Sequence, residues 1–424
     1  MSETYNILVA QSGGPTSAIN ASLAGVIRAG RACKEIGTIY GAINGIEGVL
    51  ERDLVDLTEL LGEDDSVLDV LKISPAMYLG SCRYKLEEPE KAVNQLIPEY
   101  ERIDDYTCIF NILTDYDIRY FFYIGGNDSM DTVMKLGKFG RLIDSPIRFI
   151  GIPKTIDNDL PVTDHTPGYG SAARFVATSM MEMAYDTSIY SIKSVLIVEI
   201  MGRDAGWLTA ASALARTSFS EAPHLIYLPE VDFSDSQFLV DLRGKLKDHE
   251  HVIVAVSEGV HYADGTYVSM HSAQKDQFGH TMLSGAGGYL ASLVHRKIGC
   301  KVRSVELNVL QRCAAHVSSL TDLNEAEELG KRAVYGAIEG RSEQLIYLKR
   351  LETEDGSYQV EYDFADVAEA ANKEKKMPLS MIAPGGNDIT EEFLKYVRPL
   401  IQGEPTIEYQ NGIPVYLSIK HLKV

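Results

Sequence analysis

Short apolar runs alternate with longer segments of helical periodicity along most of the chain. The runs occupy residues 6–10, 38–43, 119–124, 147–152, 195–200, 224–228, 252–257 and 301–307. Runs of about four to eight apolar residues predict strands that are buried on both faces, as in a parallel sheet. Helical spacing marks residues 16–36, 88–118, 234–248 and 323–341, whereas residues 51–72 are acidic and irregular. The alternation predicts an α/β fold through about residue 340.

The length and the charge of the chain narrow its organisation and its partners. A chain of 424 residues is too long for one hydrophobic core, so we expect two lobes. The net charge of -20 argues against a nucleic-acid partner and against an anionic membrane, because both require a basic face. No run reaches the roughly 20 apolar residues of a membrane span. An anionic small substrate remains compatible with this charge if cations gather locally.

Five cysteines are scattered along the chain, and the first apolar run begins near residue 6. The cysteine spacing fits neither a zinc site nor a disulfide framework, which is typical of a reducing compartment. The early strand leaves no room for a signal peptide. We therefore expect a cytoplasmic location.

The segment that follows the run at residues 147–152 carries four polar residues of different chemistry. Lys154, Thr155, Asp157 and Asp159 supply a cation, a hydroxyl and two carboxylates within six positions. The carboxyl ends of parallel strands are where open α/β sheets usually bind ligands. The alternative interpretation is a polar loop whose Asn and Asp residues form turns. One loop does not decide between the two.

Two other predicted strands end in Gly-Gly turns, at residues 11–15 (QSGGP) and 125–129 (GGNDS). A strand, a glycine turn and a helix together direct backbone N–H groups towards a phosphate. Neither turn is a Walker A loop or a complete GxGxxG motif. Asp128 and Ser129 have two interpretations. Either one caps the helix, or the carboxylate of Asp128 lies beside a divalent cation at the phosphate site.

Arginines occur near several other turns and strand ends. Arg83 follows a Gly-Ser turn, Arg203 follows the run at residues 195–200, and Arg303 and Arg312 come later. Arginine suits bidentate recognition of phosphate, although a solvated surface position or a pair with Asp204 is the structural alternative. Several strand ends carry Gly, Asp, Arg or Glu. Such convergence predicts phosphoryl transfer between anionic partners.

These motifs resemble the phosphofructokinase superfamily, in the order of that family and over about residues 5–340. Residues 12–20 (SGGPTSAIN) and 125–129 resemble its two phosphate-donor loops. Residues 155–159 (TIDND) resemble its catalytic segment, and residues 201–203 (MGR) a sugar-phosphate contact. The resemblance implies an α/β fold with two Rossmann-like three-layer α/β/α lobes and an active site in the cleft between them.

The resemblance also implies how the chain is divided and assembled. Residues 1–167 with part of 313–424 would form the phosphoryl-donor lobe. Residues 168–312 would form the sugar-phosphate lobe, with C-terminal segments crossing back to it. We expect a homodimer or a homotetramer, because Arg303 occupies a family position that often reaches in from a neighbouring subunit.

The roles of individual residues follow from the same resemblance. Asp157 would be the general base for the 1-hydroxyl of fructose 6-phosphate, with Lys154 and Arg203 as further catalytic residues. The sugar phosphate would contact Thr155, Ile156, Met201, Gly202, Glu258, Arg303 and Arg312. Pyrophosphate would contact Gly13, Gly14, Arg83, Gly126, Asp128 and Ser129. Mg²⁺ would be bound by Asn127 and Asp159, although the family usually has Asp at the position of Asn127.

Two residues predict the phosphoryl donor. ATP-using members of the family carry Gly at the position of Asp128 and usually Gly at that of Lys154. Asp128 would repel a nucleotide α-phosphate, and Lys154 would supply charge to a smaller donor. We therefore expect reversible, pyrophosphate-dependent phosphorylation of fructose 6-phosphate, with ATP-dependent transfer as the alternative.

Two further classes of protein compete with these hypotheses. A catalytically inactive subunit that binds only sugar phosphate would have lost its base, yet Asp157, Thr155 and Arg203 are all present. A nucleotide-dependent oxidoreductase would need a complete GxGxxG motif with a distal acidic residue, which the sequence lacks.

Overall fold

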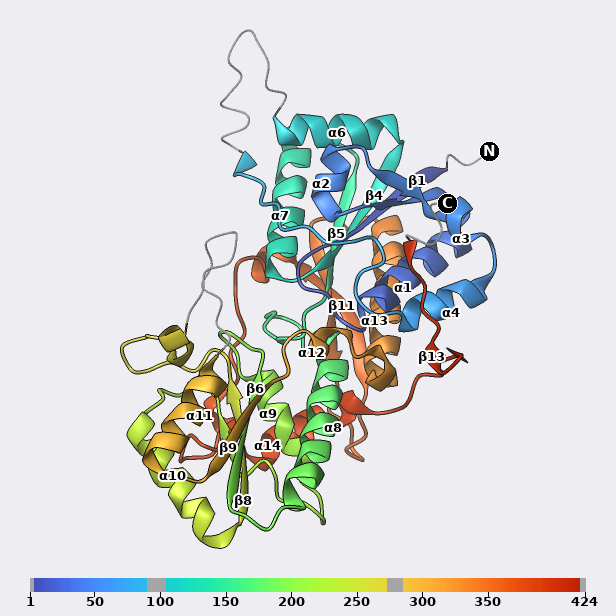
Figure 1. The fold of residues 1–424 in the computed structure, drawn as a ribbon. Helices are drawn as coiled ribbons and strands as arrows, with labels where there is room; N and C mark the ends of the chain where they lie inside the picture. The colour runs from blue at the N-terminus through green and yellow to red at the C-terminus, as the bar shows by residue number, and fades with distance from the viewer. Residues whose placement is uncertain (1–3, 90–103, 273–284, 420–424) are drawn as a thin grey trace.

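A seven-stranded sheet forms the centre of the upper lobe in Figure 1, in the order β11-β10-β5-β4-β1-β2-β3. The computed structural model describes residues 4–89, 104–272 and 285–419. The five inner strands run parallel, and β3 and β11 are antiparallel edges. The strands are β1 (Tyr5–Gln11), β2 (Ile36–Ala42), β3 (Leu54–Asp56), β4 (Ile118–Gly125), β5 (Arg148–Pro153), β10 (Gln344–Arg350) and β11 (Val360–Asp366).

A four-stranded parallel sheet forms the centre of the lower lobe, in the order β7-β8-β6-β9. Its strands are β6 (Ser194–Ile200), β7 (Leu225–Tyr227), β8 (His251–Ser257) and β9 (Lys301–Glu306). A small antiparallel pair, β12 (Tyr409–Gln410) and β13 (Ile413–Pro414), lies near the C-terminus. The chain thus has the two α/β lobes that its length and periodicity predict.

Helices cover both faces of the upper sheet because successive side chains of each strand point to opposite faces. Phe121 and Tyr123 of β4 pack with α2 (Gly45–Leu50), α6 (Asp105–Asp115) and α7 (Asn127–Leu142). Phe122 and Ile124 pack on the other side with α1 (Ile19–Ala32), α3 (Leu57–Leu61), α4 (Asp65–Ile73) and α13 (Leu320–Ile338). The lobe is therefore a three-layer α/β/α sandwich.

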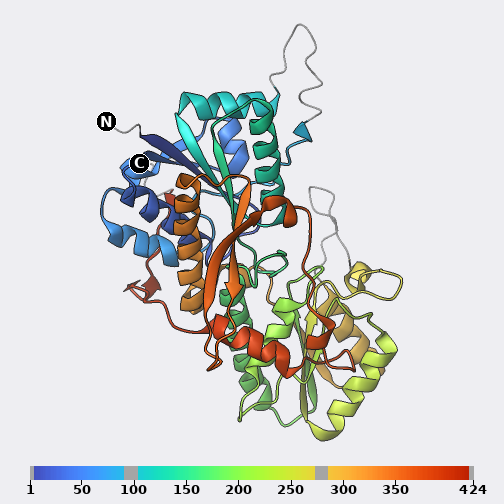
Figure 2. The ribbon, with the colours of Figure 1, turned by 180° about the vertical axis from the view of Figure 1, so that it is seen from behind.

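The lower lobe has the same three layers. On one face, α10 (Asp235–Asp248) and α11 (Ala286–Lys297) cover Val195 and Ile197 of β6. On the other, α8 (Tyr169–Ser188), α9 (Trp207–Ala210) and α14 (Glu391–Val397) cover Val198 and Ile200. A short helix, α12 (Leu310–Cys313), follows β9. Because α14 packs here, the C-terminal region crosses back to this lobe, as Figure 2 shows.

Most predicted elements are found, with shifted ends. The interpretation of residues 51–72 as irregular is wrong, because they contain β3, α3 and all but the last residue of α4. A helix was predicted at 88–118, and α6 lies in its second half. Residues 90–103 of that prediction lie outside the described residues. The helix after the second glycine turn begins at Asn127, and neither Asp128 nor Ser129 caps it.

Helices α1 and α13 cross so closely that glycine is needed at the contact. A Cβ atom on Gly25 would lie 2.0 Å from the backbone oxygen of Glu327. We expect Gly25→Ala to lower the free energy of unfolding by about 1–3 kcal/mol through overpacking. Gly244→Ala in α10 is the matched control, because nothing lies within 4 Å of its added Cβ. The control should stabilise by about 0.5–1 kcal/mol in urea unfolding; equal midpoints for the two variants would contradict the prediction.

Candidate functional site

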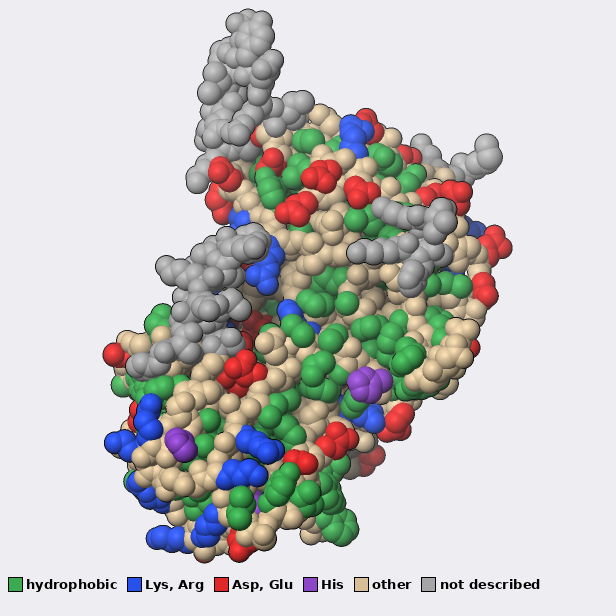
Figure 3. Space-filling model, in the orientation of Figure 1, with side chains coloured by type: hydrophobic (Ala, Val, Ile, Leu, Met, Phe, Trp, Pro, Cys, Tyr) green, Lys and Arg blue, Asp and Glu red, His purple; other side chains and the backbone are tan. Residues whose placement is uncertain are grey.

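A cavity of about 830 Å³ lies between the lobes, where strands of both sheets end. Its walls come from the ends of β1, β4 and β5 above and of β6 and β8 below, in agreement with the rule that ligands bind at the carboxyl ends of parallel strands. Figure 3 shows blue Lys and Arg side chains in the hollow between the lobes, whereas most of the charged side chains visible on this face of the upper lobe are acidic. The predicted residues in its lining are Gly13, Gly14, Arg83, Gly126, Asn127, Asp128, Ser129, Lys154, Thr155, Ile156, Asp157, Asp159, Met201, Arg203, Glu258 and Arg312.

The two glycine turns meet at one wall of the cavity. Gly13 has a φ of 78°, which glycine adopts without strain. The hydroxyl oxygens of Ser12 and Ser129 lie 2.5 Å apart and join the turns. Helix α7 starts directly after Gly126 without a side-chain cap. Helix N-termini that follow such turns favour a phosphate or another anion.

Lys154 is a buried cation that braces the first of these turns. It is only 2% exposed. Its Nζ donates to the backbone oxygens of Ser12 at 2.9 Å and Gly14 at 2.6 Å. Burial lowers the Lys154 pKa to about 7, although Asp157 and Asp159 act in the opposite direction. Two of the three ammonium hydrogens are used by the backbone, so one remains for a ligand in the cavity.

The TIDND segment, residues 155–159, alternates its side chains between the cavity and the protein interior. Thr155, Asp157 and Asp159 are partly exposed and line the cavity, whereas Asn158 is completely buried. Asn158 has a φ of 54°, a left-handed conformation that asparagine adopts more readily than most residues. The Asp157 N–H donates to Thr155 Oγ1 at 3.1 Å. Both carboxylates therefore face the same cavity.

Burial in this cavity raises the pKa of both carboxyl groups. Burial is the main cause for Asp157, and Glu258 adds to it, so the pKa of Asp157 rises to about 6 although nearby cations oppose the shift. For Asp159, burial and the neighbouring Asp157 raise the pKa to about 7. Carboxyl groups with a pKa close to neutrality suit proton transfer.

Asn127 and Asp159 have the chemistry of magnesium ligands. Asn127 Nδ2 donates to Asp159 Oδ2 at 3.3 Å. Asn127 Oδ1 is buried, and it has no hydrogen-bond partner within the described residues. The same residues contain no group of three His, Cys, Asp or Glu side chains arranged for a metal. Mg²⁺ typically takes one or two protein carboxylates and completes its shell with water and substrate phosphates, so the pair fits this ion.

Asp128 forms an ion pair across the open side of the cavity. Its Oδ1 lies 2.9 Å from Lys85 Nζ, and the two side chains are 77% and 63% exposed. The hydrogen bond with Asp128 is the main cause that raises the Lys85 pKa. Exposed pairs contribute little to stability, so the pair matters mainly because it places the Asp128 carboxylate, partly neutralised by Lys85, beside the cavity.

The lower lobe contributes Met201, Arg203, Glu258 and Arg312 to the lining. Arg312 reaches the upper lobe, since a Cβ on Gly14 would lie 3.6 Å from its Nη1 atom. Its Nε is buried without a hydrogen-bond partner in the part of the chain that is described. Burial raises the pKa of Glu258, although the Gly202 N–H opposes the shift. Cations from one lobe therefore lie beside the glycine turn of the other.

Two predicted site residues, Gly202 and Arg303, are not in the lining. Gly202 supports the site indirectly, because its N–H donates to Glu258 Oε1 at 3.3 Å. Its φ of 132° and a Cβ position 2.6 Å from Ala205 O leave no space for a side chain. Arg303 is an exposed residue of the edge strand β9. The residue does not join the cavity of its own chain.

The cavity also contains residues that the motifs did not indicate. Asn372 and Glu374 reach it from the segment after β11, and Lys85 comes from the loop before α6. Burial, followed by the charges of Asp204 and Asp159, raises the Glu374 pKa. In the sequence, residues 372–376 resemble a solvated polar loop, so no local signal marks them. Lys85 was recognisable only as a second cation beside Arg83.

The fold and the cavity together define a two-lobed α/β protein with a site for anionic ligands between its lobes. Its relatives agree with this class. The phosphofructokinase family model matches residues 6–337. A protein of Halomonas elongata named pyrophosphate--fructose 6-phosphate 1-phosphotransferase is 40% identical over 413 residues, which cover 97% of this chain and 95% of the relative.

Two further comparisons cover almost the whole chain. A Methylococcus capsulatus protein of the same name is 39% identical over 422 residues, 99% of this chain and 97% of its own. The crystal structure of a pyrophosphate-dependent phosphofructokinase from Nitrosospira multiformis superimposes with a TM-score of 0.85 and 37% identity, covering 98% of this chain and 96% of that one. This chain belongs to the phosphofructokinase family.

The raised Asp157 pKa has a consequence for stability. Because the pKa is higher in the folded protein than its ordinary value of 3.8, the carboxylate destabilises the fold above about pH 6, and this cost disappears as the pH falls below 3.8. At pH 8 we expect Asp157→Asn to raise the free energy of unfolding by about 1–3 kcal/mol. Asp144→Asn removes the same charge from an exposed position and should change it little. Denaturant unfolding of both variants checks this, and a destabilised Asp157→Asn protein would contradict it.

Proposed function

We propose that this protein reversibly transfers a phosphoryl group from pyrophosphate to the 1-hydroxyl of fructose 6-phosphate, which gives fructose 1,6-bisphosphate and phosphate. The observation that carries the proposal is the meeting of Asp157, Lys154 and Asp128 in one cavity at the strand ends. Relatives of about 40% identity over nearly their full length bear the name of this reaction. Pyrophosphate and the sugar phosphate ester are close in phosphoryl-transfer energy, so both directions are accessible.

Asp157 is the general base in this proposal. A sugar hydroxyl is a poor nucleophile until a positioned carboxylate accepts its proton, and a pKa of about 6 keeps Asp157 ionised at pH 7–8. Thr155 and Ile156 flank this carboxylate and contact the sugar. Met201, Gly202, Glu258 and Arg312 form the remainder of the sugar-phosphate site on the lower lobe, with Arg203 as a catalytic cation.

The donor is bound on the upper lobe. Gly13, Gly14, Gly126, Ser129 and Arg83 hold the pyrophosphate. The free hydrogen of Lys154 contacts its transferring group. Asp159 and Asn127 would hold Mg²⁺, which when bound would neutralise charge on the phosphate oxygens. The residues of the chain position the donor and the acceptor in line, and this positioning is the main task of a phosphotransferase.

The choice between pyrophosphate and ATP depends on the volume and charge beside the donor site. Asp128 occupies the open side with a carboxylate that Lys85 holds at 2.9 Å. A nucleotide donor would have to bring its α-phosphate and adenosine past this negative charge, whereas pyrophosphate is short enough to avoid it. ATP-dependent transfer is the second candidate function. It is favoured only if Asp128 does not repel a nucleotide.

A coupled assay with each donor in both directions tests the proposal. We expect turnover with pyrophosphate and none with ATP. Asp128→Gly combined with Lys154→Gly should raise the ATP-to-pyrophosphate ratio of kcat/KM by at least about tenfold, because the repulsion and the donor cation are both lost. Asp128→Gly alone, which changes only an exposed pair, serves as the milder variant. Turnover with ATP alone in the wild type, or an unchanged ratio in the variants, would refute the assignment.

The protein is proposed to act in the cytoplasm as a homodimer or homotetramer, with residues 1–167 and part of 313–424 as donor lobe and 168–312 as sugar-phosphate lobe. The five cysteines are free thiols. None of the described helices has the length and apolar character needed to cross a bilayer. The net charge of -20 gives no support to a nucleic-acid partner.

The edge strand β9 supports the assembly. Arg303 is exposed on it, and Lys301 at its start lies 4.2 Å from the ring of Tyr190. Exposed apolar side chains occur on this strand, at and just after the C-terminal end of α8, and at the start of α12. They are Tyr185, Ile189, Ile192, Val305, Val309 and Leu310. Exposed apolar side chains beside a strand that is the sheet edge among the described residues are typical of a subunit interface, across which Arg303 would reach the partner's sugar phosphate.

Mixing two inactive variants tests this arrangement. We expect Arg303→Ala and Asp157→Asn each to lose most activity. Denaturing and refolding them together should restore about a quarter of the wild-type activity, because half of random dimers are mixed and each mixed dimer has one intact site. Wild-type protein refolded together with Asp157→Asn serves as the reference, because it reports how far subunits of two kinds mix during refolding. If the mixture stays as inactive as its components, Arg303 does not serve a neighbouring site.

A further inference from the structure

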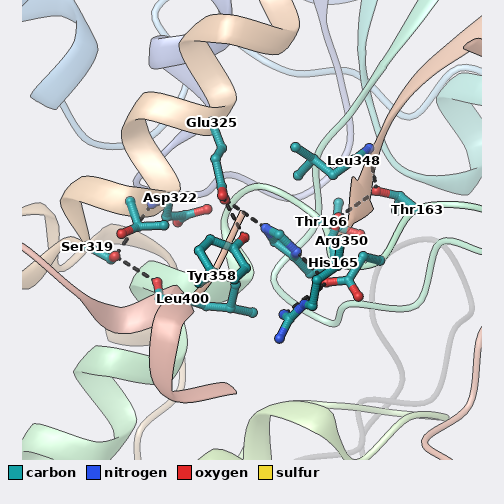
Figure 4. Close-up of polar contacts among 12 residues, drawn as sticks. Thr163, His165, Thr166, Ser319, Asp322, Glu325, Leu348, Arg350, Tyr358 and Leu400 are labelled. Carbon is teal, nitrogen blue, oxygen red and sulfur yellow. Dashed lines mark hydrogen bonds and ion pairs between the residues drawn. The ribbon is translucent and has the colours of Figure 1, made fainter. Parts of the chain in front are cut away.

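A cluster of charged side chains joins the loop that follows the TIDND segment to α13 and β10, and Figure 4 shows its members His165, Glu325 and Arg350. Asp164 and His165 belong to the loop between β5 and α8, Glu325 to α13, and Arg350 to the end of β10. None of the four lines the cavity. Two acids and two bases balance, so the cluster carries no net charge when His165 is protonated. The cluster joins elements that are distant in the sequence.

His165 is the centre of the cluster. It is 1% exposed, and its Nδ1 and Nε2 atoms lie 2.8 Å from Asp164 Oδ2 and 2.7 Å from Glu325 Oε2. Carboxylates only accept hydrogen bonds, so both ring nitrogens must carry protons to satisfy them. Burial alone would lower the His165 pKa, but Glu325 and Asp164 outweigh burial and raise it to about 9. The ring is therefore a positively charged link between two acids at neutral pH.

The two acids are fixed on their other sides. Tyr358 Oη donates to Glu325 Oε1 at 2.6 Å. Arg350 donates to Asp164 Oδ2 from Nε at 3.1 Å and from Nη2 at 3.0 Å. The Arg350 guanidinium also lies 4.9 Å from the Tyr358 ring centre. Figure 4 shows Glu325 between His165 and Tyr358. The position of the imidazole is consequently determined from several elements.

One tyrosine joins the cluster to the TIDND segment. Tyr396 Oη donates to the backbone oxygen of Asp164 at 2.8 Å and accepts from Asn158 Nδ2 at 2.8 Å. Asn158 Oδ1 accepts from the Thr166 N–H at 3.0 Å, across the same loop. Asn158 is completely buried and lies between the two carboxylates that face the cavity. A displacement of Asp164 would therefore reach both of them through Asn158.

Backbone contacts also join the two ends of the loop between β5 and α8. Thr155 pairs with Gly168 as an isolated bridge, and the Thr155 N–H donates to Pro167 O at 3.2 Å. Asp322 of α13 accepts from the Gly168 N–H and the Ser171 N–H at 2.9 Å each. The middle of the loop is held as well, because Lys375 Nζ donates to Thr163 O at 3.1 Å and to Asp164 O at 2.8 Å. The contacts of His165 and Tyr396 connect it to Glu325 and to Asn158.

We propose that His165 and Tyr396 are positioning residues for phosphoryl transfer. The imidazole ties Asp164 to Glu325, and Tyr396 transmits this constraint to Asn158, which keeps Asp157 and Asp159 directed at the cavity. The inference rests on the proposed function, because it assigns the reacting groups to residues 155–159. A cluster that served stability alone would leave turnover unchanged when it is weakened.

The test compares His165→Gln and Tyr396→Phe with the control His224→Gln. His224 belongs to the lower lobe, where its Nδ1 accepts from the Ile253 N–H at 3.0 Å, and it does not line the cavity. We expect kcat to fall about 10–100-fold in His165→Gln and about tenfold in Tyr396→Phe, because small displacements of reacting groups have effects of this size. The KM of each substrate should change by less than about threefold, because neither variant alters the phosphate-binding turns or Lys154 and Asn127, which connect those turns to the loop. The control should keep kcat within about twofold.

Two further measurements do not depend on activity. Hydrogen exchange of residues 155–168 should become faster in both variants and stay unchanged in the control. The contribution of His165 to stability is fully present below the pKa of an unfolded histidine, about 6.5, and is lost as the pH rises through about 9. Thermal unfolding of the wild type between pH 7 and 10 should therefore show a loss that His165→Gln lacks. The titratable and charged groups that face the ring are unchanged in that variant. They are Asp164, Glu325, Arg350 and Tyr358.

The outcomes separate the two proposals. Unchanged kcat and unchanged exchange in both variants, or lower stability with normal kcat, would overturn the positioning role. If wild type itself fails to turn over pyrophosphate and fructose 6-phosphate, the proposed function fails, and the exchange measurement still decides whether His165 and Tyr396 hold the loop. If His165→Gln does not fold, Tyr396→Phe decides alone, because it removes a single hydroxyl group.

Discussion

The burial of Lys154, Asp157 and Asp159 in one cavity is the constraint on which the remaining structure depends. Moving a charge out of water costs several kcal/mol unless other groups compensate for it. Here the ammonium group is compensated by two backbone oxygens of the first glycine turn and by the neighbouring carboxylates. Burial nevertheless lowers the pKa of Lys154 and raises the pKa of both carboxyl groups, so each group is shifted towards its uncharged form. The reactive groups are therefore held in the cavity at a cost in fold stability.

The same cavity explains how a chain with a large negative charge can take anionic substrates. A net charge of -20 repels phosphates over most of the surface. Within the cavity, Lys154, Arg83, Arg203 and Arg312 concentrate cations from both lobes. Because these cations come from two sheets, the attraction exists only where the lobes meet. The concentration of positive charge is thus a property of the assembled interface and not of either lobe alone.

Much of the fold was predictable because its signals are local. Apolar runs such as residues 119–124 mark strands by length alone, and glycine turns follow them directly in the sequence. The TIDND segment was recognisable for the same reason. The region 51–72 was misread because short helices with acidic N-caps, such as Asp56 and Asp64, resemble a charged loop. These short helices are stabilised by their N-caps although they lack a long apolar face.

What escaped prediction depends on contacts between distant residues. His165 meets Glu325 across 160 positions, and Asn372 reaches Asp131 across 241. Lys85 contacts Asp128 only after the loop folds over α7. Each of these residues has an ordinary local context, so a single sequence carries no mark of its partner. Charge complementarity became visible only when the topology brought the partners together.

The order of strands has a consequence for how the chain folds during synthesis. Strand β10 covers the edge of β5, yet it is made almost two hundred residues later, after the whole of the lower sheet. The four strands of the lower sheet are continuous in sequence, from Ser194 to Glu306. Domains fold as units once their residues have emerged from the ribosome. The second sheet to begin is therefore the first whose strands are all made, although its lobe still lacks α14 until Glu391–Val397 have been made. The N-terminal sheet keeps an open edge in the nascent chain until β10 appears.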